Sequence, residues 1–96
     1  MSKRRQLIDS HREEILRIVR ENHGNQVFLF GSVARGDDVE SSDIDLLIEF
    51  DEGSSLFDLK HIEDGLTKLL GVSVDVVSAG ALLKRDEHIR REAIPV

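Results

Sequence analysis

The stretch from residue 27 to residue 50 constrains the fold most, because it predicts two strands joined by a short helical turn and a polar loop over residues 37–42. Residues 27–30 read Val-Phe-Leu-Phe, an unbroken apolar run of strand length, which is typical of a strand covered on both faces. Residues 43–50 alternate between apolar side chains and a second set that begins with two aspartates, so this strand buries one face and presents the other. Residues 31–36, Gly-Ser-Val-Ala-Arg-Gly, predict a helical turn that ends at the second glycine.

Helical periodicity accounts for most of the remaining chain. Helices are predicted over residues 3–22, from a Ser54-Ser55 cap to Gly71, and over residues 81–92; a third strand is predicted over residues 72–77, and a tail or short edge segment over 94–96. This order predicts an α/β (α+β) fold with a small mixed sheet, helices packed mainly on one face and acidic side chains on the other. The 96 residues make one domain, residues 1–96.

Composition excludes several classes of function. Nineteen acidic against thirteen basic residues give a formal charge of −6, so direct nucleic-acid binding is not expected. The absence of cysteine excludes disulfides and thiolate metal sites and suits a reducing, cytoplasmic location. No apolar run approaches the roughly 20 residues of a membrane span, and no signal peptide is visible. The four phenylalanines, residues 28, 30, 50 and 57, are expected in the core.

Two carboxylates stand at strand spacing at the head of the second strand. Asp43 and Asp45 are separated by one residue, so both side chains leave the same face of the strand. Two negative charges held this close repel each other, and a bound cation is the simplest way to relieve that repulsion. The backbone amides and the hydroxyl of Gly31-Ser32 can point at phosphate oxygens. The pattern therefore predicts a site for a triphosphate and a divalent cation.

A third carboxylate lies in the predicted strand over residues 72–77. Asp75 is the only charged residue in this valine-rich run, where a carboxylate is costly unless it is paired, hydrated or bound to a cation. If this strand neighbours residues 43–50, Asp75 joins the two other aspartates on one face. Three such carboxylates can hold two divalent ions about 3.5–4 Å apart, the arrangement used in nucleotidyl displacement. A set of oxygen ligands favours Mg²⁺ or Mn²⁺ over Zn²⁺.

These motifs resemble those of a known family. The pair Gly31-Ser32, ten intervening residues, the triplet Asp43-Ile44-Asp45 and a later strand acid at Asp75 are similar to the pattern of the minimal nucleotidyltransferases, which belong to the DNA polymerase β-like superfamily. The resemblance covers about residues 26–77, and the length of the chain and its first helix fit the rest. No element of the catalytic pattern of the family is missing.

The resemblance implies a role for each of these residues. Gly31 and Ser32 would contact the triphosphate of ATP or another nucleoside triphosphate. Asp43 and Asp45 would bind two Mg²⁺ ions, and Asp75 would complete the catalytic metal site. Arg35 either reaches a phosphate or lies on the surface of the helical turn.

The resemblance also implies a partner. Family members of this size are often encoded beside a HEPN-domain toxin, and some act as antitoxins by transferring AMP from ATP to a tyrosine of that toxin. Such an active adenylyltransferase is the leading interpretation. One alternative is a binding module that neutralises its partner by contact, without catalysis. Another is transfer to a small molecule such as an aminoglycoside, although the chain has no second domain to shape a pocket for that acceptor.

Each acidic residue also has a simpler interpretation when it is considered singly. Asp43 is compatible with a cap that starts a strand, Asp45 with an exposed residue, and Asp75 with a charge that protects a sheet edge from aggregation. The four histidines lack metal-ligand spacing, and the loop acids Asp37, Asp38 and Glu40 are expected to be solvated. Only the combination of the Gly-Ser turn with three carboxylates favours a catalytic site. A second polypeptide that docks across its edge is expected to complete that site, and the chain is also compatible with an oligomer.

Overall fold

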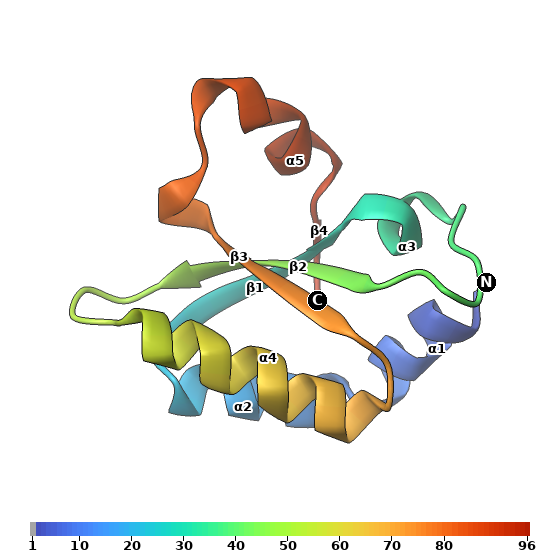
Figure 1. Ribbon diagram of the computed structural model, residues 1–96, viewed down its shortest axis with the longest axis horizontal. Coiled ribbons are helices and arrows are strands. Elements are labelled where there is room, and N and C mark those ends of the chain that lie inside the picture. Colours follow the sequence, from blue (N-terminus) through green and yellow to red (C-terminus); the bar gives the residue numbers. More distant parts are fainter. Residues whose placement is uncertain (1) are drawn as a thin grey trace.

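The two strands on either side of the Gly-Ser turn form the centre of a four-stranded mixed sheet. The computed structural model describes residues 2–96. Strand β1 (Gly24–Phe30) pairs antiparallel with β2 (Ile44–Phe50), and β2 pairs parallel with β3 (Val74–Ser78). The short β4 (Ile94–Pro95) pairs antiparallel with β1, so the strand order is β3-β2-β1-β4 (Figure 1). The predicted small mixed sheet is confirmed.

One face of the sheet is covered by two helices, α2 (Arg12–Glu21) and α4 (Leu56–Leu70) (Figure 1). The main core lies between these helices and the sheet, and it includes the residues of β2 that the alternation assigned to the buried face, Ile44, Leu46 and Ile48. All three are at most 1% exposed. In the part of the chain that the structure describes, no helix is long and apolar enough to cross a membrane.

The opposite face is only partly open, because the C-terminal segment crosses it. This segment comprises the short helices η1 (Ala79–Ala81) and η2 (Lys84–Asp86) and the helix α5 (Glu87–Glu92). It covers a second apolar cluster made of Phe30, Leu47 and Ala79, with Phe28, Val77, Leu82, Ile89 and Ala93 packed around them. The cluster includes Leu47 of β2 and Val77 of β3, which lie on the same face as the acids and two residues after Asp45 and Asp75, and covering them removes apolar surface from water. The acids are therefore left at one part of this face.

Several element boundaries differ from the predictions. The helix predicted over residues 3–22 is broken at His11, whose backbone is not helical, into α1 (Lys3–Ser10) and α2. The helix predicted over residues 81–92 begins only at Glu87, because Asp86 instead accepts a hydrogen bond from the Leu83 N–H and closes a separate turn. Phe57 is 77% exposed rather than buried, since it lies on the outer side of the first turn of α4.

The break at His11 lets α1 contact the loop that leads into β2. From α1, the Arg4 Nε donates a hydrogen bond to the Ser42 carbonyl oxygen at 2.6 Å, and its Nη2 donates to the Glu40 carbonyl oxygen. Ser42 directly precedes Asp43. A continuous helix over residues 3–22 would carry one direction throughout, whereas the two shorter helices allow α2 to pack on the sheet and α1 to hold this loop.

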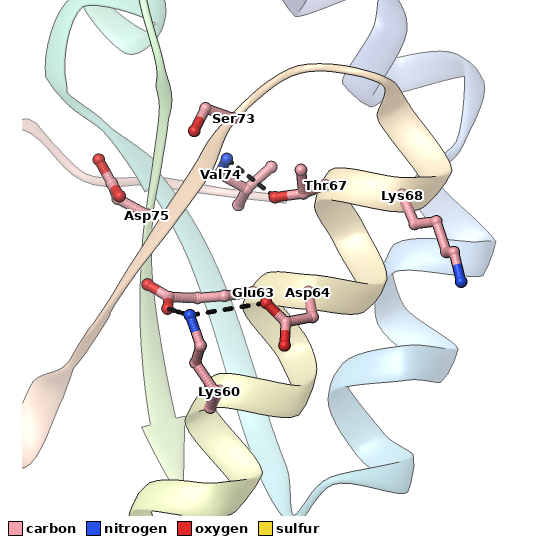
Figure 2. A pocket seen from close by; sticks show the side chains of 8 residues that line it. All are labelled: Lys60, Glu63, Asp64, Thr67, Lys68, Ser73, Val74 and Asp75. Atoms are coloured by element: carbon pink, nitrogen blue, oxygen red, sulfur yellow. Dashed lines mark hydrogen bonds and ion pairs between the residues drawn. The ribbon is translucent and has the colours of Figure 1, made fainter.

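Strand β3 lies at an edge of the sheet, but α4 satisfies two of its outward backbone donors. The Val76 N–H donates to the Glu63 Oε2 at 2.8 Å, and the Val74 N–H donates to the Thr67 hydroxyl at 3.2 Å. Figure 2 shows the latter contact, with Glu63 alongside on the same helix. Buried or half-buried backbone donors without a partner are costly, so these two side chains stabilise β3 and hold Asp75, which lies between them.

We expect Glu63→Ala to lower the free energy of unfolding by about 1–2 kcal/mol, because the Val76 N–H loses its acceptor. Urea unfolding measures this change. Glu63→Gln keeps an acceptor oxygen, so its free energy of unfolding should fall by less than half as much as that of Glu63→Ala. Asp64→Ala is the matched control, since the Asp64 side chain is 66% exposed and its carboxylate pairs with Lys60 at 3.6 Å. Equal effects of Glu63→Ala and Asp64→Ala would contradict this role of Glu63.

Candidate nucleotidyl-transfer site

The three predicted aspartates lie close together where β2 and β3 run side by side. Asp45 on β2 is the register partner of Asp75 on β3, and Asp43 immediately precedes β2. The Ile44 N–H donates to the Ser73 carbonyl oxygen at 3.0 Å, which extends the pairing of the two segments to the position beside Asp43. The structure therefore brings together the three carboxylates that the spacing placed on one face.

Burial and mutual repulsion change the acidity of two of these carboxyls. Burial raises the pKa of Asp45, and the negative charges of Asp75 and Asp43 raise it further, whereas the Arg35 guanidinium acts in the opposite direction. The pKa of Asp75 is raised first by burial and then by Asp43 and Glu63. In both cases the ionised form is disfavoured. A proton or a cation at this position is therefore stabilised.

The donor set suits a hard divalent cation, although the side chains are not closed around one. Among residues 2–96, no three His, Cys, Asp or Glu side chains are arranged so that they could hold a metal ion as they stand. Burial first, and the neighbouring carboxylates second, raise the pKa values of Asp45 and Asp75, and a cation would offset both effects. All candidate ligands are carboxylate oxygens, which Mg²⁺ and Mn²⁺ prefer. The residues thus fit such an ion in their chemistry.

The Gly-Ser turn packs directly against Asp45. Gly31 has a φ of +77°, and a Cβ atom added there would lie 2.3 Å from the Asp45 Oδ2, so the backbone approaches the carboxylate as only glycine allows. Gly31 begins the helical turn α3 (Gly31–Arg35), which ends at Gly36 as predicted. Ser32 follows Gly31 in this turn and is half-buried. The predicted phosphate-binding turn and the predicted metal ligands therefore form one site.

Arg35 and the Gly31 amide share a carboxylate that the sequence did not reveal. The Gly31 N–H donates to the Glu92 Oε1 at 3.1 Å, and the Arg35 Nη1 donates to both Glu92 oxygens at 3.3 Å. The Arg35 Nε also donates to the Asp37 Oδ2 at 3.2 Å, and the Asp37 side chain is 63% exposed, as expected of a solvated loop acid. These hydrogen bonds, with Asp37 and then Glu92, raise the pKa of Arg35. Arg35 is therefore a cation at the edge of the site.

A separate hollow lies beside the site, between α4 and β3. It measures about 510 Å³ and is lined by Lys60, Glu63, Asp64, Thr67, Lys68, Ser73, Val74 and Asp75. Figure 2 shows the Asp75 side chain projecting from β3 on the side away from α4, whereas Lys60 and the acids of α4 gather on the helix. Neither Gly31 nor Asp45 lines this hollow. It is therefore distinct from the carboxylate site and shares only Asp75 with it.

The raised pKa values predict how the stability of the metal-free protein depends on pH. Asp45 and Asp75 hold their protons more tightly in the folded protein than in the unfolded chain, so their ionisation opposes folding. This destabilisation is present above the raised pKa values and is lost as the pH falls toward the ordinary value of 3.8. We expect Asp45→Asn to stabilise the protein more near pH 7 than near pH 4, as measured by urea unfolding in EDTA. Equal stabilisation at both pH values would contradict this expectation.

The fold and the site define a class of enzyme, and comparison with known proteins supports that class. The sequence profile of the family described as the nucleotidyltransferase domain matches residues 12–94. The chain therefore belongs to this family and is a nucleotidyltransferase, as its sequence motifs predicted.

Two curated relatives are similar over most of their length. MJ0435 of Methanocaldococcus jannaschii, provisionally named a protein adenylyltransferase, is 38% identical over 92 residues, which are 93% of this chain and 97% of that protein. The protein adenylyltransferase MntA of Thermococcus cleftensis is 36% identical over 77 residues, which are 79% of this chain and 74% of that protein.

Solved structures share the fold. A structure provisionally described as a minimal nucleotidyltransferase superposes with a TM-score of 0.85 at 42% identity, covering 95% of this chain and 94% of that chain. A toxin–antitoxin structure with AMP-PNP has a TM-score of 0.74 at 20% identity, covering 86% of this chain and 69% of that chain. A structure of a tri-AMPylated Shewanella oneidensis HEPN toxin in complex with MNT antitoxin has a TM-score of 0.59 at 19% identity. The match covers 78% of this chain and 58% of that chain. The last two show a common fold only.

Proposed function

We propose that this chain is a Mg²⁺-dependent protein adenylyltransferase, which transfers AMP from ATP to a hydroxyl of a HEPN-domain toxin and thereby acts as its antitoxin. The observation that carries the proposal is that β2, β3 and the turn beginning at Gly31 meet at Asp45. Asp45 is paired in register with Asp75, and the Gly31 backbone is pressed against the Asp45 carboxylate. A close backbone approach beside paired carboxylates suits a triphosphate that is bound together with its cations.

The residues take separate roles in this proposal. The Gly31 N–H and the Ser32 hydroxyl bind phosphate oxygens, and the Arg35 guanidinium adds a positive charge at the edge of the site. Asp43 and Asp45 are the residues that would hold two divalent ions, and Asp75 completes the ligand set of one of them. When bound, these ions would neutralise the triphosphate and lower the pKa of the attacking hydroxyl.

The chemistry is a single displacement at phosphorus. The acceptor oxygen forms a bond to the α-phosphorus while the bond from that phosphorus to the oxygen bridging to the β-phosphate breaks. Pyrophosphate leaves with the electron pair, and the hydroxyl proton passes to solvent or to a nearby carboxylate. The protein contributes chiefly by positioning the nucleotide and by placing fixed charges near the phosphates.

The choice of a protein acceptor is supported by the relatives and by the shape of the domain. MJ0435 and MntA both carry the name of protein adenylyltransferases. The acidic face of the sheet is bounded by α3 and the C-terminal segment, which leave part of it open. An acceptor hydroxyl must nevertheless lie about 3–3.5 Å from the α-phosphorus. A partner that docks across the open part of the site supplies the missing wall.

Label transfer from α-³²P-ATP to a co-purified partner tests this function. The isolated domain should bind Mg²⁺-ATP weakly and turn it over slowly, and label should appear on the partner when the two proteins are mixed. Neutralisation of the partner without label would instead support a binding module. Efficient transfer by the isolated domain to a free aminoglycoside would contradict the proposed acceptor.

A further inference from the structure

A carboxylate of the protein itself lies on the donors that are proposed to bind phosphate. Glu92, the last residue of α5, accepts hydrogen bonds from the Gly31 N–H at 3.1 Å and from the Arg35 Nη1 at 3.3 Å. Its side chain is only 25% exposed, so it is held in this position rather than free in solvent. Glu92 lies 61 positions after Gly31 in the sequence.

We propose that Glu92 is a built-in competitor of the nucleotide: its carboxylate occupies the Gly31 amide and Arg35 in the free protein and leaves them when the triphosphate binds. This inference rests on the proposed function, because it assigns the same two donors to phosphate. It assigns to Glu92, which lies outside the sequence motif, a part in setting the affinity for the nucleotide.

Competition follows from the limited number of donors and from charge. Gly31 has one backbone N–H, which cannot serve both a carboxylate and a phosphate oxygen at full strength. Glu92 also adds a negative charge beside Asp45, whose pKa it helps to raise. A triphosphate brought to this position meets that charge as well. The free protein must therefore give up the Glu92 contacts before nucleotide gains them, and the apparent affinity falls accordingly.

The attachments of α5 indicate that the side chain, rather than the whole helix, moves. The Arg90 Nη2 donates to the Ala79 carbonyl oxygen at 2.9 Å, and Ile89 and Ala93 pack on the cluster around Phe30. Two residues after the end of the helix, Ile94 pairs with Leu29 of β1. These contacts hold the backbone on both sides of Glu92. Rotation of one glutamate side chain frees the donors without uncovering the second apolar cluster.

The test is the affinity of the metal-loaded protein for Mg²⁺-AMP-PNP, measured by calorimetry. Glu92→Gln keeps the shape of the side chain but removes its charge, and we expect it to bind the nucleotide about tenfold more tightly than the parent. Glu87→Gln is the matched control, since it removes the same charge from the exposed first turn of the same helix. It should bind with the affinity of the parent.

The outcomes separate this inference from the proposed function. If the parent binds nucleotide and Glu92→Gln binds it equally tightly or less tightly, the competitor role is wrong while the proposed function stands. Weaker binding by the variant would in addition make Glu92 a ligand of the nucleotide or its ions. If neither protein binds Mg²⁺-AMP-PNP, the proposed function is wrong and the inference falls with it. Equal tightening in Glu87→Gln would assign the effect to overall charge and overturn the inference.

Discussion

Replacing Asp43 and Asp45 by Asn is expected to lower the rate of nucleotidyl transfer more than about 100-fold, because loss of even an outer partner of a metal ligand costs 10- to 100-fold. The same change should leave the metal-free protein at least as stable as the parent. Burial and the neighbouring carboxylates already disfavour the ionised form of Asp45, and an amide carries no charge to be repelled. Label transfer from α-³²P-ATP and urea unfolding in EDTA measure the two effects.

Asp64→Asn is the matched control for this variant, because it removes a negative charge from a side chain that is 66% exposed on α4 and lies outside the site. It should transfer label at the parent rate. A double Asn variant that labels its acceptor as fast as the parent would show that Asp43 and Asp45 are not the metal ligands. A double variant that unfolds more readily than the parent would contradict the repulsion inferred from the pKa of Asp45.

Replacing Gly31 by Ala is expected to damage both the fold and the site. The positive φ of +77° costs an L-residue about 1–2 kcal/mol in backbone conformation alone. The added Cβ would also lie 2.3 Å from the Asp45 Oδ2, so either the turn or the carboxylate must move. A displacement near 1 Å in a catalytic group can cost about 100-fold in rate. We therefore expect reduced stability together with a loss of transfer of this size.

Gly36→Ala separates the two contributions. Gly36 has a φ of +81° at the other end of the same turn, but no atom lies within 4 Å of an added Cβ. Backbone strain should lower the free energy of unfolding of this variant by about 1–2 kcal/mol, while most of its transfer activity remains. If Gly36→Ala lost activity as severely as Gly31→Ala, strain in α3 rather than contact with Asp45 would explain the effect.

The sequence predicted the parts of the fold and site that depend on local patterns. The alternation in residues 43–50 identified the buried face of β2, because a side-chain period of two is set by the strand itself. The same reasoning predicted Asp75 on the face of Asp45 if the two strands were neighbours, and the pairing of β2 with β3 meets that condition. The roles of the six predicted residues in binding and catalysis remain predictions.

The features that sequence reasoning missed depend on contacts between distant segments. Glu92 lies in a stretch that looks like the solvated face of a helix, and only the path of the C-terminal segment brings it to Gly31. Glu63 likewise has the spacing of an exposed residue on α4 but accepts a hydrogen bond from the Val76 N–H. The break at His11 could not be foreseen, because the apolar period continues across it. Phe57 was misjudged since hydrophobicity alone does not determine on which side of a helix a residue lies.

The hydrogen bonds from β3 to α4 also restrict how another protein can recognise this domain. Many peptides bind by adding a strand to an open sheet edge, where backbone N–H and C=O groups provide the affinity. Here the Val74 and Val76 N–H groups are already bonded to Thr67 and Glu63. At the other edge, β4 has two residues, and one of them is a proline that has no N–H to donate. Strand addition at these positions is therefore disfavoured, and a partner of the proposed kind would be recognised chiefly by side-chain shape and charge.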